Sequence, residues 1–440
     1  MSEMLLLGAG ASVDAGVPGA YDMTARILEN LRKYPRFRKY AHALCYVIGG
    51  LLFEKSKENI NPLAPAINVE DLFNAVQLLA ERNTLEAAPF INSWHPFLEE
   101  IEDQYASAPR PRALDKREID EELSSFVRDA IPSSNGGRPF RLGGNSHVGD
   151  AIEKFVTGFF ENDKERGPKQ EQTFHRTNDA MIAALKDLVW IENANNVVHL
   201  APLVNALDKQ NRLVVATLNY DNGVELLASS QGVTCQTGLT EWSTTGRFET
   251  ASAGLHLLKL HGSIDWVRYN NGQQGAVMPT MMARQATRGE IKQEFHQPAL
   301  LFGNRNKLTP EGPFLALLRA FERELEQCET LTVVGYSFHD PHINVYISRW
   351  LNSNNNHILR IVNGPDFLSN AYYSIEIYIN QLFQFSNNHP GQIKDTGKYA
   401  REGLIELYGE REFVVPQATI TPTLSALEQA AKENEQKEVV

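Results

Sequence analysis

The sequence predicts an α/β fold, in which a parallel sheet is flanked by helices and a largely helical insertion follows the first strand. Short aliphatic runs recur along the chain, and each ends in small or polar residues, which is typical of buried parallel strands. Stretches with apolar residues at helical spacing lie between these runs, and such alternation favours a doubly wound sheet. The five predicted strands are residues 5–7, 214–218, 257–260, 331–334 and 358–362.

Two helices are clear from their apolar spacing. Over residues 314–328, apolar side chains follow one face at a spacing of 3.6 residues, and charged residues occupy the opposite face. Cys328 continues that apolar face and is predicted to be part of the core. A second helix is expected over residues 20–31, with Met23, Ile27, Leu28 and Leu31 facing inward.

The stretch from about residue 35 to 200 has a different character. Helical patterns occupy residues 69–79 and 180–190, and a stretch rich in Pro, Ser and Gly at 107–148 separates them. We predict a helical insertion with a loop-like segment inside it. The expected boundaries are 1–415 for a single domain with this insertion, and 416–440 for a linker and tail helix.

Composition narrows the function classes. The chain of 440 residues carries 42 Lys and Arg against 54 Asp and Glu, a net charge of −12, and 42% of its residues are hydrophobic. Such a chain can bury a sizeable core. Its acidic balance argues against direct nucleic-acid binding, which depends on Lys and Arg at the phosphates. No apolar run approaches the roughly 18 residues that span a bilayer, so we expect a soluble, cytoplasmic protein without membrane contact.

A glycine-rich turn follows the first predicted strand. The segment Gly8-Ala9-Gly10-Ala11-Ser12 lacks the third glycine of the G-x-G-x-x-G pattern, because Val13 stands there. Glycines in such a turn allow backbone N–H groups to approach a phosphate, although a tight strand-to-helix turn explains them equally well. No G-x-x-x-x-G-K-[ST] sequence occurs, which disfavours a P-loop nucleotidase.

The other predicted strands also end in polar or small residues. Ligands bind outside the carboxyl ends of parallel strands, so these residues are expected along one edge of the sheet. Taken singly, an Asn or His at a strand end is more often a hydrogen-bonded turn residue. In chain order the candidates are Asn219, Asp221, His261, Gly335, Ser337 and Asn363.

In this order, the glycine turn and the polar strand ends resemble the NAD-binding domain of sirtuins. Two longer segments, Lys-Leu-His-Gly-Ser-Ile-Asp at 259–265 and Gly-Tyr-Ser-Phe-His-Asp-Pro-His-Ile-Asn at 335–344, look like the sirtuin-like proteins of prokaryotic antiviral defence. Those proteins destroy cellular NAD. The resemblance implies a Rossmann-like fold and NAD as the substrate.

The resemblance also implies a role for each candidate residue. Asn219 and His261 would be catalytic, with His261 as the base, and Asp221 would stand near the nicotinamide carboxamide. The residues that would hold the pyrophosphate and neighbouring ribose are Gly8, Ala9, Gly10 and Ser12. Those that would hold the adenosine half are Gly335, Ser337 and Asn363.

These residue types suit the cleavage of NAD. Nicotinamide on NAD is a cationic leaving group, so its departure needs no general acid. Asn219 can orient a water or a ribose hydroxyl without adding charge beside the oxocarbenium-like centre. A neutral imidazole, with an ordinary pKa of about 6.5, is suited to accept a proton near neutral pH. Trp266, close after His261, suits either a pocket wall or core packing.

Two departures from sirtuin deacylases favour water over acetyl-lysine as the acceptor. Cys45, Cys235 and Cys328 are too far apart to form the four-cysteine zinc module of those enzymes. The Pro-x-Phe-Arg run of sirtuins is also missing, because Gly19 and Ala20 follow Pro18.

The run His339-Asp340-Pro341-His342 contains metal-ligand residue types. A metal site usually needs three or four convergent ligands, and Asp followed by Pro is typical of a helix N-cap and first helical residue. We therefore expect Asp340 to begin a helix and expect no metal.

The sequence thus predicts an NAD+ hydrolase (NADase) that releases nicotinamide and ADP-ribose, and the resemblance implies its use in antiviral defence by abortive infection. An unchecked NADase would kill its host, so the resemblance implies control by homo-oligomer formation or by a separately encoded sensor or activator, such as a hexameric ATPase or a short Argonaute. Two alternatives remain open. One is a zinc-free protein deacylase or ADP-ribosyltransferase, and the other is a non-catalytic module that senses NAD or ADP-ribose.

Overall fold

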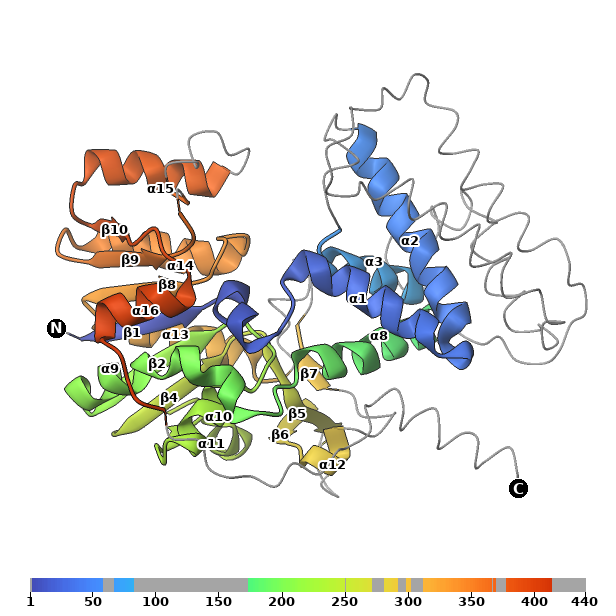
Figure 1. Cartoon of the computed structure of the whole chain (residues 1–440), viewed down its shortest axis with the longest axis horizontal. Coiled ribbons are helices and arrows are strands. Elements are labelled where there is room, and N and C mark those ends of the chain that lie inside the picture. The colour runs from blue at the N-terminus through green and yellow to red at the C-terminus, as the bar shows by residue number, and fades with distance from the viewer. Residues whose placement is uncertain are drawn as a thin grey trace, which may run out of the picture. The chain divides into compact units, whose positions relative to one another are not determined.

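The computed structural model describes residues 2–57, 67–82, 173–249, 251–270, 281–291, 298–301, 312–365, 367–368 and 377–413 (Figure 1). The chain divides into two compact units, of which one combines Met1–Gly19 with Leu185–Val440 and the other is Ala20–Ala184. The predicted loop at 107–148 and the predicted tail over 416–440 lie outside the described residues. No helix in the described ranges is both long enough and apolar enough to cross a membrane.

A seven-stranded sheet runs through the first unit. Its strand order is β10-β9-β8-β1-β2-β4-β3, and all of its strand pairs are parallel. The five predicted strands and the α/β, Rossmann-like fold are confirmed, and two short edge strands, β3 and β10, are added. The bounds are β1 (Glu3–Leu7), β2 (Arg212–Thr217), β3 (Cys235–Gln236), β4 (Gly254–Lys259), β8 (Thr330–Val334), β9 (Ile358–Val362) and β10 (Ile393–Asp395).

The carboxyl ends of five of these strands are level with one another. Leu7 of β1 pairs with Thr217 of β2 on one side and with Val334 of β8 on the other. Thr217 pairs in turn with Lys259 of β4, and Val334 with Val362 of β9. These five residues form one row, so the loops that follow them begin at the same edge. The neighbours of β1 come from distant parts of the chain, which makes this edge a topological switch point.

Burial explains why these strands are continuous aliphatic runs. Every residue of β8 is buried, because a parallel sheet is covered on both faces. Helix α13 (Phe314–Gln327) has the predicted apolar face, with Leu317 and Phe321 fully buried and Cys328 in the core as expected. The other helices of this unit are η1 (Ala9–Ala11), η2 (Val13–Ala15), η4 (Ala194–Leu200), α9 (Pro202–Gln210), α10 (Gly223–Ser230), α11 (Leu239–Thr245), α12 (Arg288–Ile291), α14 (Pro341–Ser353), α15 (Ile377–Asn388) and α16 (Ala400–Tyr408).

A small antiparallel sheet, in the order β6-β5-β7, was not predicted. Its strands are β5 (Gly262–Asn270), β6 (Met281–Gln285) and β7 (Pro298–Leu300). Gly262 starts β5 with a φ of +83°, and a Cβ atom there would lie 1.9 Å from the Ala299 carbonyl oxygen, so the tight turn after His261 requires glycine. Trp266 of β5 is fully buried in the core, which favours its packing role over a pocket wall.

The second unit is helical in its described part, as predicted for the insertion. It contains α1 (Ala20–Lys33), η3 (Pro35–Phe37), α2 (Arg38–Lys57), α3 (Val69–Ala80) and the larger part of α8 (Thr173–Val189). Met23, Ile27 and Leu31 of α1 are buried, as expected from their spacing, whereas Leu28 is only half-buried. Helix α8 begins earlier than predicted, at Thr173. The hydroxyl of Thr177 donates to the Thr173 carbonyl oxygen at 2.8 Å, which satisfies a buried hydroxyl inside the first turns of the helix.

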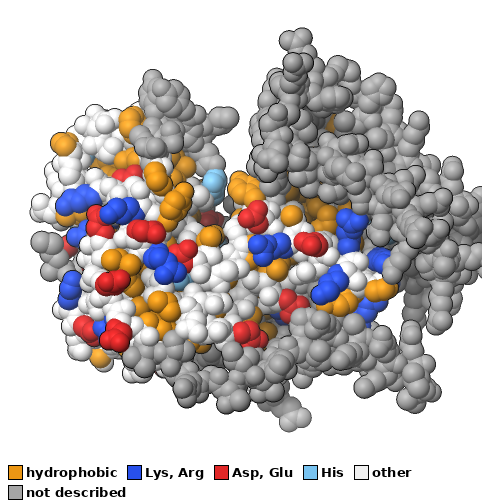
Figure 2. Space-filling view, in the orientation of Figure 1, with side chains coloured by type: hydrophobic (Ala, Val, Ile, Leu, Met, Phe, Trp, Pro, Cys, Tyr) orange, Lys and Arg blue, Asp and Glu red, His pale blue; other side chains and the backbone are white. Residues whose placement is uncertain are grey.

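Charges of both signs share the surface. On the face seen in Figure 2, Lys and Arg side chains are interspersed with Asp and Glu side chains, and the described residues in view form no large area of either sign. The described residues on this face therefore form no basic patch that would attract an anionic polymer such as a nucleic acid.

Candidate functional site

The turn after β1 packs tightly against the turn after β8. A Cβ atom at Gly8 would lie 2.6 Å from the Tyr336 Cα, and one at Gly10 would lie 2.8 Å from the Gly335 Cα. Gly335 itself has a φ of +63°, and a Cβ atom there would lie 2.3 Å from the Ala11 nitrogen. Contact between two backbones at the switch point therefore requires all three glycines.

Hydrogen bonds within the protein hold the same turn. The N–H of Gly8 donates to the Val334 carbonyl at 2.9 Å, and the N–H of Gly10 donates to the Gly335 carbonyl at 2.8 Å. The N–H of Ser12 is also bonded within the turn, at 3.1 Å. The interpretation as a tight strand-to-helix turn thus accounts for the glycines, and their contact with NAD stays a prediction.

Asn219, two residues beyond the level row of strand ends, is tied to the turn after β1. Its Nδ2 donates to the Gly8 carbonyl oxygen at 2.8 Å and to the Ser12 Oγ at 2.9 Å. The Ser12 Oγ donates to the Asp221 Oδ2 at 2.7 Å. Ser12 and Asp221 are buried, and Asn219 is half-buried. Four predicted site residues from two strand ends therefore form one cluster, which we call the amide cluster (Gly8, Ser12, Asn219 and Asp221).

The chemistry of these groups fixes the direction of each hydrogen bond. A carboxylate and a carbonyl can only accept, so the Ser12 hydroxyl gives its proton to Asp221 and accepts from Asn219. The amide nitrogen of Asn219 must then face the turn, where both of its protons are used. The Oδ1 atom of Asn219 is consequently held in a fixed orientation as a hydrogen-bond acceptor.

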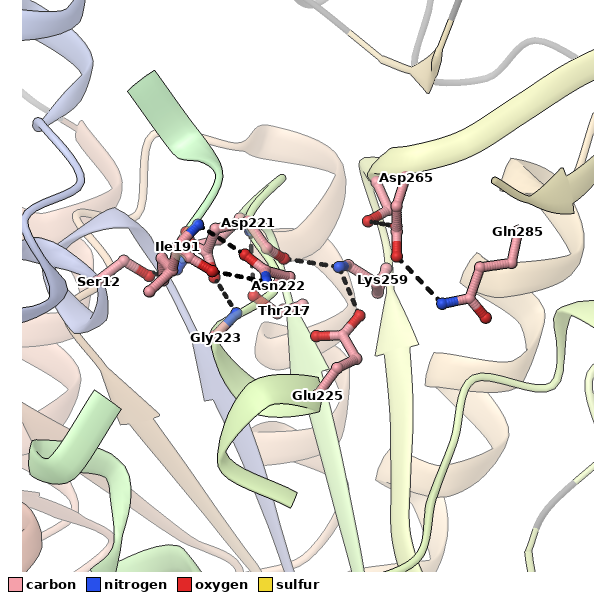
Figure 3. Close-up of polar contacts among 12 residues, drawn as sticks. Ser12, Ile191, Thr217, Asp221, Asn222, Gly223, Glu225, Lys259, Asp265 and Gln285 are labelled. Atoms are coloured by element: carbon pink, nitrogen blue, oxygen red, sulfur yellow. Dashed lines mark hydrogen bonds and ion pairs between the residues drawn. The ribbon is translucent and has the colours of Figure 1, made fainter. Parts of the chain in front are cut away.

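A buried lysine supports the loop after β2. The Nζ of Lys259, which is fully buried at the end of β4, donates to the Asp221 carbonyl oxygen at 2.6 Å and to the Glu225 Oε1 at 2.7 Å (Figure 3). Burial opposes the charge on Lys259, but the carboxylates of Glu225 and Asp265 outweigh it and raise the pKa of the ammonium group. The Asp221 Oδ1 accepts from the Gly223 N–H at 2.8 Å, so side chain and backbone of Asp221 are both held.

His261 follows β4 and is only 1% exposed. Its Nε2 lies 3.8 Å from the Asp340 Oδ1, and its ring stacks on that of His342 with centroids 5.6 Å apart. The ring of Tyr220, the residue after Asn219, lies 6.4 Å from the His261 ring. The loops after β2 and β4 are thereby in contact, and His261 has two neighbours from the start of α14. We call His261, Asp340 and His342 the imidazole cluster.

Asp340 occupies the predicted N-cap position of α14, and Pro341 is the first helical residue as expected. Its carboxylate makes no capping bond to the helix N–H groups. The Oδ1 atom lies beside the imidazole rings instead, 3.8 Å from the His261 Nε2 and 4.0 Å from the His342 Nδ1. The hydroxyl of Tyr336 accepts from the Asp340 N–H at 3.1 Å and thereby fixes the backbone at this point.

The residues predicted to hold the adenosine half lie at the ends of β8 and β9. Asn363 donates through Nδ2 to the Tyr336 carbonyl oxygen at 2.8 Å, which joins the two loops. Ser337 is exposed, and its Oγ lies 2.5 Å from the His339 Nδ1. Together with Gly335, these residues lie in adjacent loops beside the turn after β1.

The contacts of three residues with the predicted site residues were not expected from the sequence. Asp340 and His342 were recognised as metal-ligand types, but nothing in the sequence indicates that they lie beside His261, about 80 residues earlier. Lys259 gave a weaker signal, namely a charged residue at the end of an aliphatic strand, where burial requires a partner.

Residues 213–376 match the family model of the SIR2-like domain. The match supports a sirtuin-like domain. It covers both catalytic candidates, Asn219 and His261, and the loop with Asp340, whereas β1 and its glycine turn lie before it. No curated protein matches the chain. The domain is consistent with NAD-related activity and suggests an NAD-dependent enzyme.

Proposed function

We propose that this protein is an NAD+ hydrolase that releases nicotinamide and ADP-ribose. The observation that carries the proposal is the level row of strand ends at the switch point. Asn219 and His261 each stand two residues beyond that row, on the neighbouring strands β2 and β4. An amide with a fixed acceptor atom and an imidazole are the groups that such a hydrolysis needs.

In the proposed reaction, the bond between the ribose C1′ and the nicotinamide nitrogen breaks, and its electron pair neutralises the pyridinium. A water oxygen forms the new bond to C1′. Asn219 Oδ1 orients that water or the adjoining ribose hydroxyl, and His261 accepts the proton that the water loses. The proton then passes to solvent, so the products are nicotinamide, ADP-ribose and one proton.

NAD would lie across the loops that follow β1, β8 and β9. Ala9 and the other residues of the glycine turn would stand beside the pyrophosphate, with Asp221 near the carboxamide. Gly335, Ser337 and Asn363 would contact the adenosine half. The place favours NAD, since dinucleotides bind at the switch point of such sheets. The N–H groups of Gly8, Gly10 and Ser12 are already bonded within the protein, so the turn would meet the pyrophosphate through close approach of its backbone and not through these donors.

We further propose that the enzyme depletes the cytoplasmic NAD pool during antiviral defence, which ends in abortive infection. An NADase of this kind needs control before infection. The proposed control is homo-oligomer formation or a separately encoded sensor or activator, either a hexameric ATPase or a short Argonaute. No nucleic acid or membrane is proposed as a direct partner of this chain.

Product analysis tests the reaction type. Purified protein is incubated with NAD, with and without an acetylated peptide, and the products are separated by chromatography. ADP-ribose formed without peptide supports the hydrolase. Formation of acetylated ADP-ribose or modified protein only when an acceptor is present would establish the deacylase or transferase instead. Tight NAD binding without products over the whole range of protein concentrations would favour a sensing module over a hydrolase that is controlled by homo-oligomer formation.

A further inference from the structure

We propose that His261, Asp340 and His342 form a binding site for a transition-metal ion of the zinc type, and that the bound ion blocks NAD hydrolysis by occupying His261. The existence of the site stands on the geometry of the imidazole cluster. The blocking effect rests on the proposed function, in which His261 is the base.

The three residues have the spacing of a site that is nearly formed. Each offers one ligand atom, and the three atoms lie within 4.8 Å of one another. The Asp340 Oδ1 lies 3.8 Å from the His261 Nε2 and 4.0 Å from the His342 Nδ1. A tetrahedral zinc with ligands at about 2.1 Å holds its ligand atoms about 3.4 Å apart. Each His–Asp pair must contract by about 0.5 Å to reach that geometry, and the two histidine nitrogens, which lie within 4.8 Å of each other, by up to about 1.4 Å.

The ligands come from two elements with well-defined backbones. His261 lies between β4 and β5, and its carbonyl oxygen accepts from the Leu301 N–H at 3.0 Å. Asp340 and His342 flank Pro341 at the start of α14. The side chain of His261 is 1% exposed, whereas those of Asp340 and His342 are 11% and 14% exposed, so an ion could enter from the side of the α14 residues. From the sequence, only Asp340 and His342 stood in a segment with metal-ligand residue types. The fold brings His261 to them as the third ligand.

The donor set selects the class of ion. Two imidazole nitrogens and one carboxylate oxygen are typical zinc ligands, and three protein ligands leave a fourth position for water. Mg²⁺ and Ca²⁺ prefer sites built from oxygen atoms and would bind weakly here.

Metal binding and base catalysis exclude each other at one nitrogen. The lone pair of an imidazole nitrogen either coordinates the ion or accepts a proton. A zinc ion on the His261 Nε2 would therefore remove the base from the proposed reaction. Occupancy of the site and the rate of nicotinamide release should consequently move in opposite directions.

The site is tested first by zinc binding, without reference to activity. The full chain is stripped with a chelator, and Zn²⁺ affinity is measured by competition with a chromogenic chelator. Two variants, His342→Ala and Asp340→Asn, should each weaken binding at least about 10-fold, in line with ligand loss. His339→Ala, three residues away, is the matched control and should bind zinc as the wild type does. Wild-type affinity in both ligand variants, with unchanged circular dichroism, would overturn the site.

The blocking effect is tested on the same proteins. Zinc should inhibit nicotinamide release by the wild type over the concentration range in which it binds, and His342→Ala should need at least about 10-fold more. Zinc-stimulated release, or equal inhibition of both proteins, would overturn the blocking effect. If metal-free protein releases no nicotinamide at any protein concentration, hydrolysis by this chain alone fails and the blocking effect fails with it, while zinc affinity still decides the site.

Discussion

The amide cluster and the imidazole cluster stand at the ends of neighbouring strands but are held in different ways. In the amide cluster, Asn219, Ser12 and Asp221 are joined by hydrogen bonds of 2.7–2.9 Å. In the imidazole cluster, the polar contacts of Asp340 with the two histidines are 3.8 and 4.0 Å long, beyond hydrogen-bond range, and the two imidazole rings stack.

This difference in contact distances indicates which side chains are fixed in position before a ligand binds. The amide cluster has little freedom, because each donor in the Asn219–Ser12–Asp221 chain has one defined acceptor. The imidazole cluster is held by packing and by charge at longer range, so shifts of about 0.5 Å break no direct bond between its members. Fixed positioning suits the group that orients a nucleophile, and adjustability suits a group that exchanges protons or ions.

The largest expected loss of stability comes from removing the lysine that supports the amide cluster. Lys259→Met leaves the Glu225 carboxylate and the Asp221 carbonyl without their buried partner, and should lower the free energy of unfolding by about 3–5 kcal/mol. Urea unfolding measures this. Lys398→Met is the control, since the side chains of Lys398 and its partner Glu406 are 48% and 46% exposed, and the loss should stay below about 1 kcal/mol. Equal losses would contradict the supporting role of Lys259.

The contact between the two glycine turns is tested by a matched pair of glycines. Gly335 and Gly397 have φ of +63° and +62°, but only at Gly335 would an added Cβ atom meet a neighbour within 4 Å. Gly397→Ala should cost about 1–2 kcal/mol from its backbone conformation alone. Gly335→Ala should cost about 1–3 kcal/mol more, because the turns must separate. Equal melting temperatures of the two variants would show that the turns do not press on each other.

The fixed orientation of Asn219 is tested by an isosteric change. Asn219→Asp places a carboxylate oxygen against two groups, the Gly8 carbonyl and Ser12, and should cost about 1–3 kcal/mol. It should also slow nicotinamide release about 100-fold, because the orienting acceptor moves. Asn205→Asp is the control, since Asn205 Nδ2 also donates to backbone carbonyls, at 3.2–3.3 Å, away from the candidate site. The Oδ1 of Asn205 accepts from Arg411 at 2.9 Å, so the new charge gains an ion pair there. That variant should keep its activity, and a similar loss of activity in both would contradict the account.

The smallest expected effect lies in the imidazole cluster. Asp340→Asn removes a charge that makes no capping bond and lies 3.8 Å or more from either histidine. Because Asp340 is buried and Asn keeps its shape, the free energy of unfolding should fall by about 1–2 kcal/mol, less than for Lys259→Met. A loss of several kcal/mol would mean that this cluster is as tightly held as the amide cluster.

Sequence patterns were sufficient to predict the main strands of the parallel sheet, but not to predict which distant side chains contact one another. Aliphatic runs such as 331–334 predict parallel strands because both faces are buried. This holds for β8 throughout and for β1, β2 and β4 after their first residue, whereas β9 also has the half-buried Arg360 inside it. Strand order was open until the register of β1 with β2 and β8 was known. The antiparallel sheet was missed, because β5 contains polar residues such as Asp265 and β7 has only three residues.

The site shows the same limit. Strand-end position was enough to select Asn219 and His261, since parallel strands bring their carboxyl ends together. Neither spacing nor composition indicates that the α14 start reaches His261, because that contact depends on how the loop after β8 folds through Phe338, a residue with a φ of +59°. Long-range neighbours of this kind arise from backbone geometry that local patterns do not encode.

The most direct test of the account is nicotinamide release from NAD by metal-free protein, measured over a series of protein concentrations without any acceptor peptide. Wild type is compared with Asn219→Ala and His261→Ala, with NAD affinity measured in parallel. The account predicts release by the wild type and a loss of about 100-fold or more in both variants. Tight NAD binding by the wild type with no release at any concentration, or release that survives both substitutions, would contradict it.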